Sequence, residues 1–165
     1  MSLNWNYGTG AQSSTASTLS YYPWMYNDAI RTTQVTPTLA KFTDILAPLD
    51  KPVEIKISTE TIANVYTTLA NSKVPVSEQN SNTSGSSVFV QLRTTADYVR
   101  TVGTTESKVQ LPLEARLQIR VPNDAELSND ELDKLLGALI ACIRKQDGSS
   151  RLGEILRGSL VPKEI

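Results

Sequence analysis

The sequence contains no histidine and only one cysteine among its 165 residues. Without histidine the chain cannot form a Ser–His or Cys–His nucleophile pair, and one cysteine cannot complete a zinc site of thiolates and imidazoles. Cys142 has no partner for an intramolecular disulfide, so we predict that it is a small buried hydrophobic residue without a chemical role. The phosphate-binding patterns GxxxxGK[ST] and GxGxxG are also absent. We therefore expect no enzyme activity, no catalytic residue, no metal and no cofactor.

Long apolar runs and an excess of positive charge are missing as well. Residues 1–20 are rich in Ser, Thr, Asn and Gly and contain no basic segment followed by an apolar run. We therefore expect neither secretion nor membrane insertion. The 16 Lys and Arg residues face 17 Asp and Glu residues, which gives a net charge of -1. Such a chain does not coat nucleic acid through bulk positive charge, so any nucleic-acid contact must come from a local patch.

Three segments alternate apolar and polar residues with the period of a half-buried strand. They are 53–58 (VEIKIS), 87–93 (SVFVQLR) and 113–121 (LEARLQIRV). In the first of them, Val53, Ile55 and Ile57 should face the core. Between the first two, residues 62–70 suit either a strand or a turn. Residues 71–86 form a Ser, Asn, Thr and Gly tract that predicts a long mobile loop.

The first fifty residues are predicted to form an arm. They contain an aromatic cluster, which could stack on bases but is more typical of anchors that hold an arm to the body. After this cluster, Leu39, Phe42, Ile45 and Leu46 have helical spacing and predict a short helix or turn. The aromatic residues of the cluster are Tyr21, Tyr22, Trp24 and Tyr26.

The C-terminal part of the sequence predicts two helices. Ser128 and Glu131 match a capping box, in which each side chain accepts a hydrogen bond from the other residue's backbone N–H. Asp147-Gly148 is predicted to end this helix, and a shorter helix should span about 150–157. The apolar stripe of the two helices, which we expect to form the core and a dimer contact, consists of Leu132, Leu135, Leu136, Leu139, Ile140, Ile143, Leu152, Ile155 and Leu156.

Strands followed by helices indicate an α+β fold. We predict an antiparallel sheet of about five strands, plus an N-terminal hairpin, followed by two C-terminal α-helices. The whole chain, residues 1–165, should form a single domain. Within it we expect an arm or hairpin in 1–50, the sheet in 51–122 and the helices in 123–165.

The segment 111–122 (LPLEARLQIRVP), the capped Leu-rich helix, the Asp147-Gly148 turn and the last short helix together resemble the coat proteins of levivirus-type single-stranded RNA bacteriophages. The resemblance is strongest from 87 to 162. It implies an interlocked homodimer, in which each subunit lays its helices across the partner's sheet, and assembly of dimers into an icosahedral shell. The implied location is the virion, assembled in the host bacterial cytoplasm without a membrane. The loop at 96–108 would make the contacts between subunits.

The resemblance also implies that single-stranded viral RNA binds the sheet face that the helices leave uncovered. On the three strands this face carries four cations and the carboxylates of Glu54 and Glu114. Such mixed charges also occur on strand faces that merely contact water. With the resemblance we favour RNA contact, through genome packaging and repression of translation by binding an RNA hairpin. The alternative is a soluble dimeric RNA-binding regulator that forms no shell. The predicted RNA-binding residues are Lys56, Ser58, Phe89, Gln91, Arg93, Arg116, Gln118 and Arg120.

Overall fold

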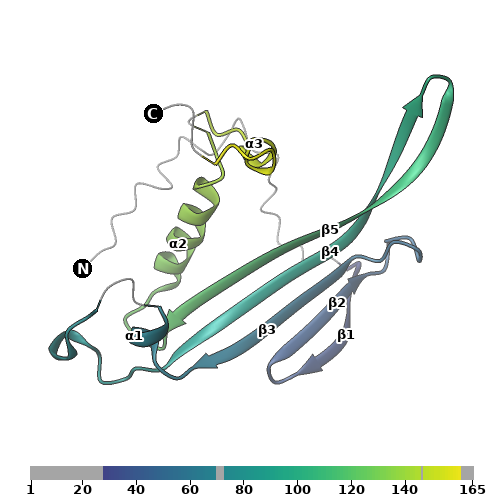
Figure 1. Ribbon diagram of the computed structural model, residues 1–165. Helices are drawn as coiled ribbons and strands as arrows, with labels where there is room; N and C mark the ends of the chain where they lie inside the picture. The colour runs from purple at the N-terminus through teal and green to yellow at the C-terminus, as the bar shows by residue number, and fades with distance from the viewer. Residues whose placement is uncertain (1–27, 70–72, 146, 161–165) are drawn as a thin grey trace. The chain divides into compact units, whose positions relative to one another are not determined.

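The computed structural model describes residues 28–69, 73–145 and 147–160, and within them five strands form one antiparallel sheet (Figure 1). The strands lie side by side in the order in which they occur in the chain. This confirms the predicted α+β class. The strands are β1 (Ile30–Thr36), β2 (Leu39–Asp44), β3 (Glu54–Ile62), β4 (Gly85–Val102) and β5 (Thr105–Pro122). The helices are α1 (Val65–Thr68), the 3₁₀ turn η3 (Val76–Glu78), α2 (Asn129–Ala141) and α3 (Leu152–Leu156).

The chain divides into two compact units, which we describe separately. One unit, residues 23–124, contains the whole sheet together with α1 and η3. The other unit contains residues 1–22 and 125–165, and its described part carries α2 and α3. In the described residues, no helix is both long and apolar enough to span a membrane. That the entire chain behaves as a single domain stays a prediction.

The register of the strands sorts their side chains onto two faces. Directly paired residues of an antiparallel sheet point to the same side, and successive residues point to opposite sides. Ile55 is paired with Phe42 on one side and Leu92 on the other, so these apolar side chains share a face. The other members of this apolar face on β2–β5 are Ala40, Ile57, Val88, Val90, Ala115, Leu117 and Ile119.

The predicted helix or turn at Leu39 to Leu46 is wrong, because residues 39–44 form strand β2. Strand β2 pairs with β1 across a two-residue connection, and the sheet therefore begins at Ile30 rather than at residue 51. The same segment also alternates with period two, since Ala40 and Phe42 face Ile57 and Ile55. This short segment fits the spacing of a helix and the alternation of a strand equally well, and it forms a strand because it pairs with β3. The aromatic cluster of the predicted arm lies outside the described residues.

The predicted loop at 96–108 is also wrong. Strands β4 and β5 pair without interruption from Gly85–Pro122 to Val102–Thr105 and form a ribbon that extends past β3 (Figure 1). Gly103, with a φ of 64°, supplies the left-handed backbone that the first position of such a two-residue turn needs. The segment is rich in Thr and Val, which favour strands, but it lacks strict alternation of apolar and polar residues.

The connection from β3 to β4 holds local hydrogen bonds throughout its described part. The side chain of Asn64 caps α1 by accepting hydrogen bonds from the backbone N–H groups of Tyr66 at 2.9 Å and Thr67 at 3.4 Å. The hydroxyl of Tyr66 accepts a hydrogen bond from the backbone N–H of Asn80 at 2.7 Å. In segment 62–70, for which strand and turn were both open, Ile62 ends β3 and residues 65–68 form a short helix.

Helix α2 begins at the predicted capping box and ends before the predicted stop at Asp147-Gly148. Both bonds of the capping box between Ser128 and Glu131 are present, each at 3.3 Å. The helix ends at Ala141 instead of Asp147, because the polar residues that follow form their own turn. In that turn the Asp147 carboxylate accepts hydrogen bonds from the backbone N–H of Ser149 at 2.9 Å and from its hydroxyl at 2.7 Å. Cys142, predicted to be buried, is exposed at the helix end.

The core of the described chain is small. Four apolar residues are buried, namely Ala29, Ile55, Ile62 and Val65. Val65 of α1 contacts the start of β4, where a Cβ on Gly85 would clash with its side chain and would lie 2.6 Å from the carbonyl oxygen of Val121. Gly85 is therefore required by close packing, because no larger residue fits between α1 and β5. Of the three residues predicted to face the core from 53–58, Ile55 is buried while Val53 and Ile57 are half-buried.

Candidate nucleic-acid interface

All eight residues predicted to contact RNA lie on one face of the sheet, opposite to the apolar face. We call this the polar face, and it is formed by rows of paired residues across β3, β4 and β5. The alternation in the sequence was sufficient to assign these residues to a common side, although it could not give their order. The rows are Glu54–Arg93–Glu114, Lys56–Gln91–Arg116, Ser58–Phe89–Gln118 and Glu60–Ser87–Arg120.

Strand β2 adds a cation to this face that the sequence analysis missed. Lys41 is paired directly with Lys56, so the row that contains Gln91 and Arg116 carries three cations on four strands. Like charges directly opposite each other on a sheet are unfavourable. Among the described residues, neither Lys41 nor Lys56 forms an ion pair with a carboxylate. An anion bound over this row would relieve the repulsion.

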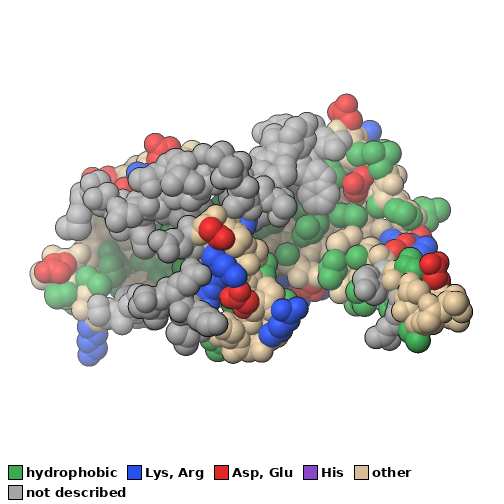
Figure 2. Space-filling model, turned by 90° about the horizontal axis from the view of Figure 1, so that it is seen from above, with side chains coloured by type: hydrophobic (Ala, Val, Ile, Leu, Met, Phe, Trp, Pro, Cys, Tyr) green, Lys and Arg blue, Asp and Glu red, His purple; other side chains and the backbone are tan. Residues whose placement is uncertain are grey.

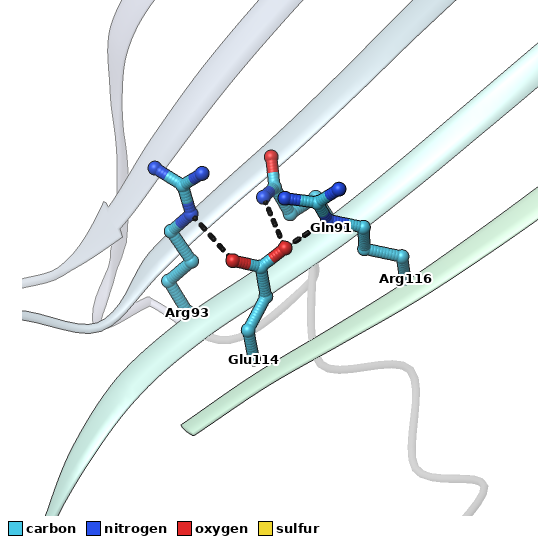
Figure 3. A network of polar contacts seen from close by, with 4 residues as sticks. All are labelled: Gln91, Arg93, Glu114 and Arg116. Carbon is cyan, nitrogen blue, oxygen red and sulfur yellow. Dashed lines mark hydrogen bonds and ion pairs between the residues drawn. The ribbon is translucent and has the colours of Figure 1, made fainter. Parts of the chain in front are cut away.

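At one end of the polar face, four side chains form a network around Glu114 (Figure 3). One carboxylate oxygen, Oε2, accepts a hydrogen bond from Nε of Arg93 at 3.2 Å. The other, Oε1, accepts hydrogen bonds from Nε2 of Gln91 at 2.8 Å and from Nε of Arg116. The hydrogen bond from Arg116, with smaller effects from Gln91 and Arg93, holds the pKa of Glu114 below its ordinary value. Glu114 therefore stays ionised at neutral pH between its two arginines.

A second set of contacts joins β4 and β5 one row further along. With its amide oriented to suit its neighbours, Gln118 accepts hydrogen bonds from Nε and Nη2 of Arg120, both at 3.2 Å, and from the hydroxyl of Ser87 at 3.1 Å. Arg120 thus rests along the sheet surface. The arrangement presents an ordered cation and an adjoining aromatic ring, Phe89, on the same strands.

The polar face has an excess of positive charge in a chain with a net charge of -1. On strands β2 to β5 its rows carry five cations and three carboxylates, and the third carboxylate is that of Glu60. On the side of the molecule drawn in Figure 2, Lys and Arg side chains (blue) lie next to Asp and Glu side chains (red) in several places. The polar face is thus a local basic patch of the kind that phosphate contacts need. The five cations are Lys41, Lys56, Arg93, Arg116 and Arg120.

The apolar residues predicted to form the helix core are largely uncovered in the single chain. Leu135 and Leu139 on α2 are 40% and 53% exposed, and Leu156 on α3 is 85% exposed. Leu152 is also exposed, whereas Leu132, Leu136, Ile140, Ile143 and Ile155 are half-buried. Ile143 lies beyond the end of α2, in the turn before α3. Apart from Ile143, the residues of the apolar stripe lie on α2 and α3, but the single chain does not bury them.

Comparison with known proteins decides the fold. No protein-family model and no curated protein sequence matches the chain. Among solved structures, the virus-like particle of bacteriophage AVE015 matches with a TM-score of 0.75 at 24% identity, over 96% of this chain and 97% of that one. The fold is levivirus coat-like. The virus-like particle of bacteriophage GQ-112 has the same fold, with a TM-score of 0.65 at 12% identity over 96% of this chain and 95% of that one.

The levivirus coat-like fold agrees with the resemblance drawn from the sequence. The likeness covers 96% of the chain, and the sequence analysis predicted an N-terminal hairpin before the main sheet. That hairpin exists as β1 and β2 and belongs to the same sheet as β3, β4 and β5. The fold thus places the polar face on one continuous five-stranded surface.

Proposed function

We propose that the protein is the major capsid protein of a single-stranded RNA bacteriophage and that it builds the shell of the virion. The observation that carries this proposal is the fold, which matches two phage virus-like particles over 96% of the chain. Its mechanism is assembly. Subunits form homodimers, the dimers join into a closed icosahedral shell in the bacterial cytoplasm, and the polar face binds the genomic RNA. No catalytic step, metal or cofactor is part of this function.

Two surfaces support dimer formation. Strand β5 is an edge of the sheet over 18 residues, and unpaired N–H and C=O groups at an edge favour pairing with another strand. A second copy related by a two-fold axis could continue the sheet there. The exposed apolar stripe of α2 and α3 is a second surface that gains free energy when a partner covers it.

The outer half of the β4–β5 ribbon, residues 94–113, is proposed to make the contacts between dimers. Within the described residues no third strand pairs with it, and it carries five exposed apolar residues, four on the apolar face and the fifth, Val99, on the polar face. Exposed apolar residues on a paired ribbon favour contact with protein rather than with RNA. This assigns to the ribbon the role that the sequence suggested for a loop at 96–108. The residues are Val99, Val102, Val109, Leu111 and Leu113.

RNA binding is proposed for the polar face because its cations exceed its carboxylates and because the lysine row would be stabilised by phosphate. A two-fold dimer doubles the number of these cations. Binding of one RNA hairpin by the dimer would also repress translation of the message that contains it. A soluble dimeric RNA-binding regulator would use the same face, and the two functions differ in whether a shell forms.

The test is expression of the full chain in bacteria, followed by size-exclusion chromatography, electron microscopy and the absorbance ratio at 260 and 280 nm. We expect closed particles that contain RNA. A discrete dimer that stays unassembled after RNA is added would contradict the capsid function and support the regulator.

The polar face is tested by Arg116→Glu combined with Arg120→Glu. Both side chains lie on the polar face, so the fold should persist while the RNA content of the particles falls, by roughly half or more given the loss of phosphate contacts. The matched control is Lys73→Glu with Lys134→Glu, which makes the same change of charge at exposed positions outside the sheet. Equal RNA content in both double variants would remove the polar face from the RNA site.

A further inference from the structure

The Glu114 network combines two features that are unusual on a surface proposed to bind a polyanion. A carboxylate lies at its centre, and this carboxylate uses both oxygens to hold cations (Figure 3). Arg93 approaches Oε2, while Gln91 and Arg116 approach Oε1. A carboxylate at this position lowers the positive charge of the face, so bulk electrostatics gives no reason for it to be there.

The hydrogen bonds leave the outer parts of both arginines available. Each arginine donates its Nε–H group to Glu114, and the terminal Nη groups make no other hydrogen bond within the described part of the chain. The side chains of Arg93 and Arg116 are 54% and 58% exposed. Arg93 and Glu114 also line an open hollow of about 480 Å³. A phosphate can therefore reach the guanidinium groups from the solvent side.

Fixing an arginine in this way favours phosphate binding. A guanidinium group is planar and presents paired N–H donors that match phosphate oxygens, but its long side chain loses much freedom when it binds. A partner that already holds Nε removes part of that cost before the ligand arrives. A lysine in the same place would gain less, because its three N–H donors rotate freely and form no rigid planar fork that matches phosphate oxygens.

We propose that Glu114 is a positioning residue that holds Arg93 and Arg116 with their Nη groups directed to backbone phosphates of RNA. This inference rests on the proposed RNA binding by the polar face and specifies which groups bind the phosphate. Glu114 itself does not contact the RNA. Its carboxylate lowers the net positive charge of the polar face by one, and its hydrogen bonds hold two arginines in fixed orientations.

The substitution Glu114→Gln distinguishes positioning of the two arginines from a purely electrostatic effect of the carboxylate charge. It removes a negative charge, so bulk electrostatics predicts tighter RNA binding and a steeper dependence on salt. If Glu114 positions the arginines, binding instead becomes weaker, because the amide offers an NH₂ group where the carboxylate accepted a hydrogen bond from Arg93 or Arg116. The opposite signs of the two expectations make the outcome decisive.

The experiment measures binding of a fluorescently labelled, random-sequence single-stranded RNA by anisotropy, at protein concentrations where light scattering detects no particles. We expect Glu114→Gln to weaken binding about three- to tenfold, as for one lost charge-assisted hydrogen bond. The slope of log K against log salt concentration should become shallower by about 1, as for one lost phosphate contact. Unchanged or tighter binding would overturn the role of Glu114.

Two further variants control this measurement. Glu60→Gln makes the same change of charge on the polar face, at a residue whose side chain forms no hydrogen bond or ion pair in the described structure, and should bind RNA as tightly as the wild type or more tightly. Arg116→Lys keeps the charge but loses the Nε donor, and should weaken binding as Glu114→Gln does. This variant decides the question if Glu114→Gln does not fold. Wild-type protein that binds no RNA would overturn the RNA-binding function as well.

Discussion

The two halves of the β4–β5 ribbon have the same pairing and different surroundings. In the inner half, residues 85–93 of β4 pair with β5 on one side and with β3 on the other. In the outer half, residues 94–102 of β4 pair with β5 alone. The inner half includes the buried residues Ser87 and Gln91, whereas Leu111 and Leu113 in the outer half are 44% and 51% exposed. Burial in this ribbon depends on neighbouring strands rather than on apolar character.

In the proposed function, the two halves of the ribbon have different tasks. The inner half has a flanking strand that fixes the positions of the polar side chains, and precise positions are what recognition of phosphate requires. The outer half has two free edges and exposed apolar side chains, which suit it to contacts with another protein surface. Mutations can test whether the two halves differ in this way.

The largest difference is expected for truncation of apolar side chains. Ile55, beside Leu92 of the inner half, is 5% exposed, and Ile55→Ala should lower the free energy of unfolding by roughly 2–5 kcal/mol. Leu111→Ala in the outer half should cost less than about 1 kcal/mol in dissociated protein, because Leu111 is already exposed. Urea unfolding of the two variants measures both values. Equal costs would mean that the outer half is buried before assembly.

Glycine substitutions should give the next largest difference. Gly85→Ala would force a Cβ against Val65 and the carbonyl oxygen of Val121, and we expect a loss of about 3 kcal/mol from overpacking. Gly103→Ala meets no atom within 4 Å and suffers only from its positive φ, which should cost about 1 kcal/mol. Gly153→Ala also meets no atom within 4 Å and lies inside α3, so this control should leave stability unchanged or raise it by up to about 1 kcal/mol. A larger loss for Gly103→Ala than for Gly85→Ala would contradict the close packing at the inner end.

The smallest effect is expected from the ion pairs of the outer half. Asp97 pairs with Lys51 and with Lys108, the latter at 3.1 Å, and the hydrogen bond from Lys51 holds the pKa of Asp97 below its ordinary value of 3.8. A lowered pKa in the folded state adds stability above the unfolded-state pKa, and this stability disappears as pH falls through the folded-state value. Asp97→Asn should therefore slightly speed amide exchange in residues 94–102 at neutral pH. The difference from wild type should shrink as pH falls below the ordinary value of 3.8 and the Asp97 carboxylate becomes protonated.

The sequence predicted the inner half of the ribbon well and the outer half poorly. In residues 113–121 every second residue is apolar, and this alternation correctly gave both the strand and its polar face. In residues 94–102 the pattern is broken by Asp97 and by consecutive threonines, because a ribbon exposed on both faces needs no alternation. The alternation is weak in the outer half because no flanking strand requires one of its faces to be apolar.

The sequence predicted which face most of the candidate residues occupy, but it did not predict their neighbours or their contacts. Lys41 was overlooked because Leu39 and Phe42 suggested a helix, and only pairing with β3 places this lysine beside Lys56. Glu114 was counted as a charge on the face, yet its contacts with Arg93 and Arg116 depend on the register between β4 and β5. Alternation predicts which face a residue occupies, whereas register decides what it touches. RNA binding by these residues stays a prediction.

The order of the strands in the sheet has a consequence for how the subunit folds. Every strand pairs with the strand that precedes or follows it in the chain, so each hairpin can close as soon as its second strand leaves the ribosome. Strand β5, which carries the edge proposed for the dimer, is then the last strand to be added. Pairing of two subunits through β5 can therefore begin only after the rest of the sheet has formed. The topology thus orders folding before association in time.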